Sequence, residues 1–389
     1  MLDTLHGMSR VSQVLADRSA RIRELKAQGK KAVGYFCSYV PVEILTAMDL
    51  VPVRILGDMD EPVTEMDTVL PTSFCPFLRN CINTVFRGRY DFLDGVVGAH
   101  SCDAQEKSIH VWKSKIKYEF YHYLDMPATL HPWGADMYRS SLEKFKSSCE
   151  AWTGKPLSGE ALEASILAHN RHRSLVRELY ELKRFDPPLV SGSDTLRILT
   201  AISGLPVDEG SALLEAVIQE ARAGKIQADT QDKKRILVVG ACLDALPLIR
   251  LIEDFDADVV MDDNCMGART YFRDVSITKD PMQGLASRYL DLTCARTFRE
   301  TVAGEFRKDH AADLETRFAH LGNYIEKWRV EGVVIQLVRF CDPFGYEVPE
   351  LKDYLNSINI PNLYLETEYT TGSLAPLKTR LQTFLETLL

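Results

Sequence analysis

The chain has 389 residues, of which 46 % are hydrophobic and 26 % are charged. This composition is typical of a globular protein and excludes a largely disordered chain, and the length favours two domains. The formal net charge of −9 argues against nucleic acid as the main partner, because phosphate binding needs a basic surface.

The N-terminal segment predicts an amphipathic helix and not a signal peptide, because no apolar core precedes a small-residue cleavage site. No run approaches the length of apolar sequence that a membrane span needs, so we expect a cytoplasmic protein without a membrane anchor. The chain contains nine cysteines. A reducing compartment disfavours disulfides, so some of these cysteines are candidates for a metal or redox role.

The first half of the chain predicts three buried strands and several helices. The apolar runs at 31–37, 51–57 and 92–100 have the length and composition of strands, with helices expected between them at 41–49 and 73–87. Two longer stretches, at 136–153 and 159–184, carry apolar residues at helical spacing.

A break follows these helices, where the prolines and glycine of FDPPLVSGSD interrupt the helical pattern. We place the domain boundary there. The prediction is an N-terminal domain of residues 1–190 with a helical extension, and a C-terminal domain of residues 191–389.

The second half repeats the pattern of the first. Apolar runs at 235–243, 257–263, 331–340 and 360–369 again alternate with helical segments. Continuous runs of Val, Ile and Leu in this arrangement are typical of doubly wound parallel sheets. The predicted fold class is therefore α/β, with a parallel sheet in each of two domains and a helical connecting stretch.

Three cysteines lie where predicted strands meet predicted helices. Cys75 precedes a proline at the start of a helix, while Cys102 and Cys341 come just after apolar runs. Ligands of open α/β sheets gather at the carboxyl ends of the strands, so these three thiols would meet in the cleft between the domains. Three thiolates can hold an iron–sulfur cluster and leave one iron open to a substrate.

The spacing of these cysteines would also suit three unrelated buried positions, or a zinc site completed by His100 or Cys81. A nucleotide-binding protein without a cluster is a further alternative. Against it, the chain lacks a GxxxxGK[ST] loop, and GACLDA at 240–245 lacks the GxGxxG spacing.

Several separated motifs, in the same order, carry a resemblance to one family. The motifs are GYFCSYVPVEILTAMDLVPVRILG, FCPFLRNC, DFLDGVVGAHSCD, FCDPFGYEVPELKDYL and the C-terminal IPNLYLETEYTTGSLAPLKTRLQTFLETL. Over nearly its full length the chain resembles the iron–sulfur subunits of 2-hydroxyacyl-CoA dehydratases and benzoyl-CoA reductases. The resemblance implies two Rossmann-like domains with a [4Fe–4S] cluster in the interdomain cleft, held by Cys75, Cys102 and Cys341.

The other six cysteines do not match the ligand set of that family, and we expect them to be structural. Two of them, Cys37 and Cys81, are candidates for a place near the site. The remaining four are Cys149, Cys242, Cys265 and Cys294.

The resemblance also implies an activity and its partners. It implies an acyl-CoA thioester substrate, a homologous second subunit in a heterodimer, and a separate ATP-hydrolysing iron–sulfur activator that supplies electrons at very low potential. Benzoyl-CoA reductase is the preferred activity, on the overall character of the segment IKYEFYHYLDMPATLHPW. The alternatives are a 2-hydroxyacyl-CoA dehydratase that eliminates water through a ketyl radical, and a non-catalytic subunit that relays electrons.

Two further residues are candidate catalytic groups, although a structural role would account for each as well. Ser38 opens the turn after the first predicted strand and would face the cleft, or would simply cap the next helix. His100 lies beside Cys102 and would donate a proton or a hydrogen bond, or would simply pack. Arg269 is a candidate for binding a CoA phosphate or for a surface salt bridge.

Overall fold

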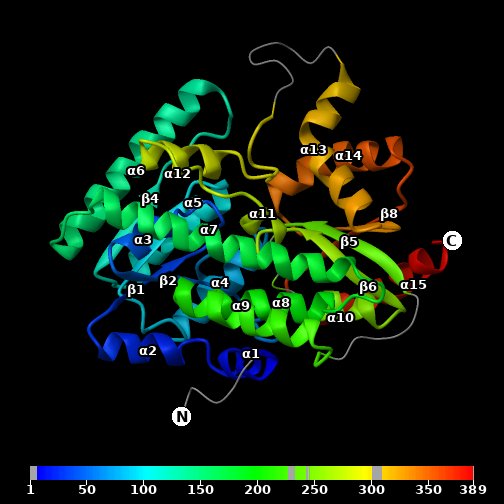
Figure 1. Ribbon diagram of the computed structural model, residues 1–389, viewed down its shortest axis with the longest axis horizontal. Coiled ribbons are helices and arrows are strands. Elements are labelled where there is room, and N and C mark those ends of the chain that lie inside the picture. The colour runs from blue at the N-terminus through cyan, green and yellow to red at the C-terminus, as the bar shows by residue number, and fades with distance from the viewer. Residues whose placement is uncertain (1–6, 227–232, 242–243, 245, 300–308, 389) are drawn as a thin grey trace.

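The computed structural model describes residues 7–226, 233–241, 244, 246–299 and 309–388. Figure 1 shows an N-terminal α/β half, coloured blue to cyan, beside a C-terminal half, coloured light green to red. The long helix α7 (Gly159–Glu181) lies across both halves, packing on α3 of the first and on α11 of the second.

The first sheet has four parallel strands in the order β2-β1-β3-β4. Three of them confirm predicted strands. The strands are β1 (Lys31–Tyr35), β2 (Leu50–Arg54), β3 (Gly95–Ala99) and β4 (Phe120–Leu124). Pro52 has no N–H to donate, and its place in the edge strand β2 avoids a lost ladder bond.

The second sheet repeats the strand order of the first. It is also wholly parallel, in the order β6-β5-β7-β8, so in each sheet the first strand in sequence lies between the second and the third. All four strands confirm predicted ones, although residues 242 and 243 of the first predicted run lie outside the described residues. The strands are β5 (Lys234–Gly240), β6 (Ala257–Asp263), β7 (Gly332–Val338) and β8 (Asn362–Thr367).

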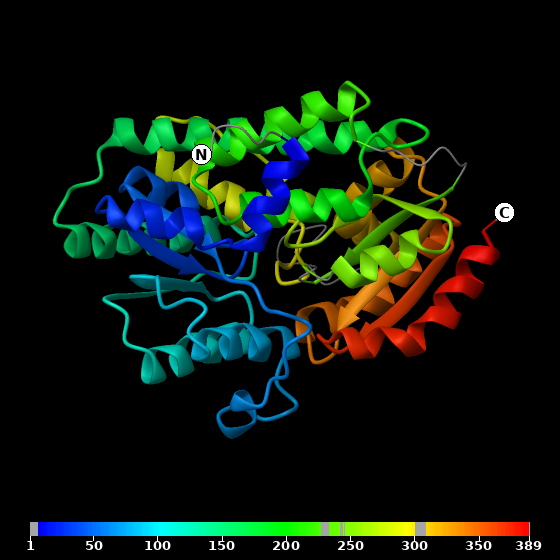
Figure 2. The ribbon, with the colours of Figure 1, turned by 90° about the horizontal axis from the view of Figure 1, so that it is seen from below.

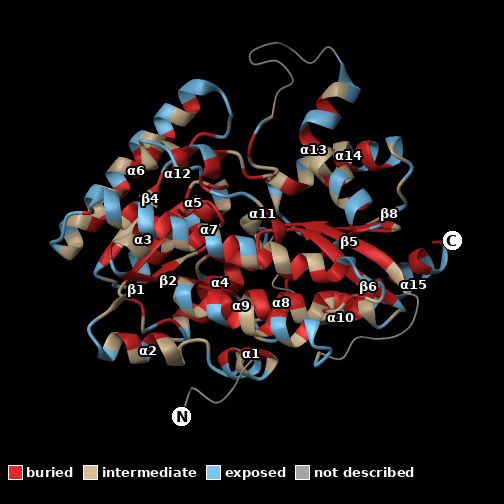
Figure 3. Cartoon of the chain, viewed as in Figure 1, coloured by how far each residue is buried: buried red, intermediate tan, exposed pale blue. Residues whose placement is uncertain are grey.

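The central strands β3, β5 and β7 are almost wholly buried, and Figure 3 shows the sheet around β5 in red. Helices cover both faces of such sheets, which explains why the strands have continuous apolar sequences. The α/β class with two parallel sheets is therefore confirmed. The domain boundary near residue 190 stays a prediction.

Most of the predicted helices are confirmed with small changes at their ends. The predicted N-terminal helix is divided into two, and none of the described helices is long and apolar enough to cross a membrane. In chain order the helices are α1 (Gly7–Ala16), α2 (Ala20–Ala27), α3 (Val42–Ala47), α4 (Pro76–Phe86), α5 (Asp103–Lys115), α6 (Pro132–Thr153), α7, α8 (Gly192–Ile202), α9 (Val207–Arg222), α10 (Leu246–Glu253), α11 (Ala268–Tyr271), α12 (Pro281–Leu290), α13 (His310–Lys327), α14 (Asp342–Ser357) and α15 (Lys378–Glu386).

The helical connecting stretch joins the two halves by packing. Helix α7 contacts α9 and α12, and the N-terminal α1 packs on α8 and α9. Figure 2 shows the green helices α7, α8 and α9 in a layer along one side of both sheets. The two halves are therefore held by a shared helical layer as well as by the chain connection.

A buried ion pair fixes this layer to the first half. The Glu43 carboxylate on α3 is fully buried and accepts from Arg173 on α7 and from the Tyr289 hydroxyl on α12, the latter at 2.7 Å. Burial would raise the pKa of Glu43, but Arg173 opposes it and the pKa is lowered to about 2. Three helices from distant parts of the chain thus meet on one carboxylate.

We expect Glu43→Gln to lower the free energy of unfolding by about 3–5 kcal/mol, because it leaves the Arg173 guanidinium buried without its counter-charge. Glu209→Gln is the control. It removes a partly exposed pair with Arg21 and should cost less than about 1 kcal/mol. Urea unfolding followed by circular dichroism measures both, and equal losses in the two variants would contradict the assignment.

The same pair predicts a pH dependence. The folded-state pKa of Glu43 lies below its ordinary value of 4.5, so the pair stabilises the fold above that pH and loses its effect as the pH falls toward 2. The free energy of unfolding of the wild type should therefore fall more steeply below pH 4.5 than that of Glu43→Gln.

Candidate functional site

Six cysteines line one cavity of about 90 Å³ between the two sheets. The cavity walls follow β1 and β3 of the first sheet and β5, β6 and β7 of the second. Because all strands are parallel, their carboxyl ends meet here. The cysteines are Cys37, Cys75, Cys102, Cys265, Cys294 and Cys341.

The three predicted ligands share one local structure, since each is the N-cap of a helix. Cys75 precedes α4, Cys102 precedes α5 and Cys341 precedes α14. The backbone N–H groups of a first helical turn have no partner within the helix, and at the start of α5 one of them points to sulfur. The Cys102 Sγ accepts from the Gln105 N–H at 3.4 Å. N–H···S bonds of this kind tune the potential of an iron–sulfur cluster.

Local backbone features explain how two of these caps form. Gly98 in β3 lets α5 approach closely, because a Cβ there would lie 2.1 Å from Ile109 Cγ1. Phe340 has φ of +60°, a left-handed conformation that costs a bulky residue free energy. This residue turns the chain sharply from β7 into α14 and places Cys341 at the cavity.

The thiols of the three predicted ligands are neutral at pH 7 in the absence of metal. Burial raises the pKa of Cys102 to about 12, and it raises the pKa values of Cys75 and Cys341 as well. A metal displaces such protons, because it binds the thiolate and stabilises its charge.

The spacing of the three sulfurs differs from that of a single-ion site. Sulfurs on one tetrahedral zinc ion would lie about 3.8 Å apart. Within the described ranges, the only three ligand atoms of His, Cys, Asp or Glu within 4.8 Å of one another belong to His100, Asp103 and Glu106. A four-iron cluster separates its cysteine sulfurs more widely, since each binds a different iron. The cavity therefore fits the cluster better than it fits zinc.

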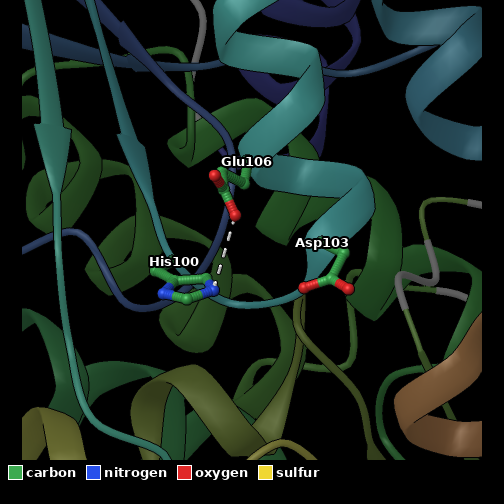
Figure 4. A group of neighbouring side chains, drawn as sticks. All are labelled: His100, Asp103 and Glu106. Carbon is green, nitrogen blue, oxygen red and sulfur yellow. Dashed lines mark ion pairs between the residues drawn. The ribbon is translucent and has the colours of Figure 1, made fainter.

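His100 lies outside the cavity wall, at the end of β3. Its Nδ1 is 3.4 Å from Asp125 Oδ1 and its Nε2 is 3.7 Å from Glu106 Oε2. Figure 4 shows His100 and Glu106 facing each other, with Asp103 at the start of α5. The imidazole is about one third exposed, so the structure does not bring it together with the three thiols.

Ser38 does not line the cavity of the thiols. It is buried, and its Oγ donates to the Cys265 carbonyl at 3.1 Å and lies 2.7 Å from Thr270 Oγ1. It does not cap a helix, since α3 begins after Pro41 without a side-chain cap. The serine thus ties the turn after β1 to the turn after β6.

The other cysteines are divided between the cavity and the core. Cys37 lines the cavity, whereas Cys81 is buried in α4 and does not. Cys149 is buried in α6, and Cys242 lies outside the described residues. Sequence reasoning did not place Cys265 or Cys294 in the site. Cys265 comes just after β6, as Cys341 comes just after β7, so its place after a strand could have predicted a site residue. Cys294 follows a helix, and its place in the sequence predicts no such role.

Two arginines form part of the site in ways that the sequence did not indicate. Arg269 is buried, so the expected surface salt bridge is wrong, whereas a role in binding a CoA phosphate stays a prediction. It pairs with Asp263, and its Nη1 lies 3.5 Å from Cys265 Sγ. Arg296 lines the cavity and donates to three backbone carbonyls of the first half, those of His100, Met126 and Pro127.

Comparison with known proteins agrees with the resemblance noted in the sequence. The chain is 27 % identical over 363 residues to one of the subunits of benzoyl-CoA reductase from Thauera aromatica, covering 92 % of this chain and 91 % of that protein. It is 27 % identical over 385 residues to the putative dehydratase subunit YjiM of Escherichia coli, covering 94 % of each. It is 24 % identical over 387 residues to the beta subunit of (R)-2-hydroxyglutaryl-CoA dehydratase of Acidaminococcus fermentans, covering 97 % of each.

A family match spans the same length. Residues 37–388 match the family described as 2-hydroxyglutaryl-CoA dehydratase, D-component, a range that includes all six cysteines of the cavity and every strand of the two described sheets except β1. The chain therefore belongs to the 2-hydroxyglutaryl-CoA dehydratase D-component family.

Proposed function

We propose that the chain is the [4Fe–4S] subunit of a low-potential acyl-CoA enzyme, with two Rossmann-like domains and the cluster in the cleft between them. The observation that carries the proposal is the set of three N-cap thiols, Cys75, Cys102 and Cys341, on one cavity between two parallel sheets. When bound, the cluster would supply single-electron transfer at low potential.

The cavity walls suit such a cofactor. Phe36, Phe77 and Phe344 are among the lining side chains, and they make part of the wall beside the thiols apolar. Low solvent access and N–H···S bonds are two of the features by which proteins set cluster potentials. The guanidinium of Arg296 adds a fixed positive charge at the wall.

The proposed enzyme is a benzoyl-CoA reductase, in which electrons are transferred to the aromatic ring of a thioester. Similarity to a subunit of such an enzyme supports it. A 2-hydroxyacyl-CoA dehydratase is the alternative, supported by similarity to a dehydratase beta subunit. A chain that only relays electrons to a partner is the third possibility.

The proposal includes two partners. Several relatives are named as subunits of reductases or dehydratases, which supports a homologous second subunit. An ATP-hydrolysing activator would supply the electron. The roles of Ser38 and His100 in catalysis stay predictions, because neither side chain lines the cavity of the thiols.

The cluster is tested by metal analysis after strictly anaerobic purification. We expect about four iron and four sulfide per chain in the wild type, and loss of both in Cys75→Ser, Cys102→Ser and Cys341→Ser. Cys149→Ser is the matched control, because Cys149 is also buried but lies in α6 away from the cavity. Zinc, or no metal, in the wild type would refute the proposed function.

The substrate is tested with the second subunit, the activator and ATP. A reductase should convert benzoyl-CoA to a product with two more hydrogens, and it should use ATP at every turnover because the electrons leave with the product. A dehydratase should instead remove water from a 2-hydroxyacyl-CoA and use ATP only to begin turnover, since its electron is recycled. Mass spectrometry of the CoA products, with an ATP assay, separates the two activities.

A further inference from the structure

A second cavity, of about 70 Å³, lies beside the cavity of the thiols. Ser38 and Thr270 line it, and their hydroxyls lie 3.1 Å and 2.7 Å from the Cys265 carbonyl oxygen. The turn at Cys265, which lines the cavity of the thiols, therefore separates the two cavities. The second cavity has room for several water molecules, and it is much smaller than a pocket for a coenzyme.

Three arginines from three different elements line this second cavity, which we call the arginine cavity. Arg54 ends β2, Arg173 lies in α7 and Arg288 lies in α12. Each of these arginines is at most 5 % exposed. The described residues that line the cavity include no aspartate and no glutamate. The wall of the arginine cavity is therefore positively charged.

Arg288 has no carboxylate partner in the part of the chain that the structure describes. Its Nε donates to the Arg273 carbonyl at 3.3 Å and its Nη2 donates to the Thr270 carbonyl. The guanidinium carbon lies 4.2 Å from the centre of the Tyr289 ring. Among the described residues, nothing accepts a hydrogen bond from Nη1. One nitrogen of a buried guanidinium is thus available to a ligand.

The buried carboxylate of Glu43 does not supply this partner. One of its oxygens accepts from Arg173 and the other accepts from the Tyr289 hydroxyl at 2.7 Å. Its charge therefore offsets that of Arg173. The positive charge of Arg288 stays without a counter-charge inside the protein.

The two histidines of the arginine cavity add no charge at pH 7. Burial lowers the pKa of His169 to about 4 and the pKa of His172 to about 3. His169 Nε2 lies 3.0 Å from Thr46 Oγ1, and His172 Nδ1 lies 3.0 Å from Ser211 Oγ. Hydroxyl groups thus hold both neutral rings in place, and the charge of the wall comes from the arginines.

A buried cation without a counter-charge is costly, and a bound anion removes that cost. The planar guanidinium of arginine matches the oxygens of a carboxylate or a phosphate better than it matches a spherical ion. The small volume of the cavity limits the ligand to an ion of a few heavy atoms.

We propose that the arginine cavity binds a small oxyanion, a carboxylate or a phosphate, with Arg288 as its main partner. Arg54 and Arg173 add positive charge around the ion. The bound ion would join β2, α7 and α12, which come from distant parts of the chain, and would stabilise their packing. This site goes beyond the proposed function, because it needs neither the cluster nor the acyl-CoA.

Thermal unfolding of the anaerobically purified full chain tests the site. Phosphate in the low millimolar range should raise the Tm of the wild type and reach saturation, whereas sodium chloride at the same ionic strength should not. Low concentrations are needed because concentrated phosphate stabilises folded proteins in general. Arg288→Met should lose the response to phosphate.

Arg177→Met is the matched control for this variant. Arg177 also lies on α7, but it pairs with Asp274 and does not line the arginine cavity. The control should keep the response of the wild type. An equal rise in Tm for Arg288→Met and the wild type would overturn the site.

Equilibrium dialysis of the wild type against radioactive phosphate needs no variant, so it decides the question even if Arg288→Met fails to fold. We expect saturable binding of a single ion to each chain. Displacement of the phosphate by a lower concentration of acetate or malonate would assign a carboxylate as the preferred ligand, and retention would assign phosphate. The proposal would be refuted if phosphate did not bind and neither carboxylate raised the Tm. Iron content enters neither test, so failure of the proposed function would be recognised separately.

Discussion

The parallel direction of every strand is the constraint on which the site depends. A parallel strand needs a crossover before the next strand can begin, and the crossover starts from the carboxyl end. In each of the two sheets, the strand-to-helix turns therefore lie together at the carboxyl ends of the strands. These two groups of turns border one cavity. Residues that are far apart in the sequence, such as Cys102 and Cys341, become neighbours because each occupies such a turn.

The same constraint explains what the sequence could predict. Seven of the eight strands in the described part of the chain have continuous apolar sequences, and the rule that ligands gather at carboxyl ends correctly grouped Cys75, Cys102 and Cys341 at one cavity. The missing strand, β4, has Tyr and His at its central positions, which are only partly buried. Apolar continuity is a sign of burial on both faces, and the edge strands β2 and β6 carry it because they are buried almost throughout.

The remainder of the site depends on tertiary contacts that no local pattern encodes. Cys294 follows a helix, and its loop reaches the cavity because Arg296 donates to carbonyls of the first half. Arg269 was expected at the surface, yet it is buried because Asp263 and backbone carbonyls satisfy its donors. The sequence alone does not distinguish an arginine that is exposed to solvent from one that pairs with a buried carboxylate.

The division of the cavity between the two halves has a consequence for biosynthesis. Three of its cysteines, Cys37, Cys75 and Cys102, come from the first sheet and its turns, while Cys265, Cys294 and Cys341 come from the second. Translation proceeds from the N-terminus, so the early thiols emerge from the ribosome long before Cys341, which lies in the last strand-to-helix turn of the cavity. The six thiols can therefore meet only after the chain has been synthesised past Cys341 and both halves have folded.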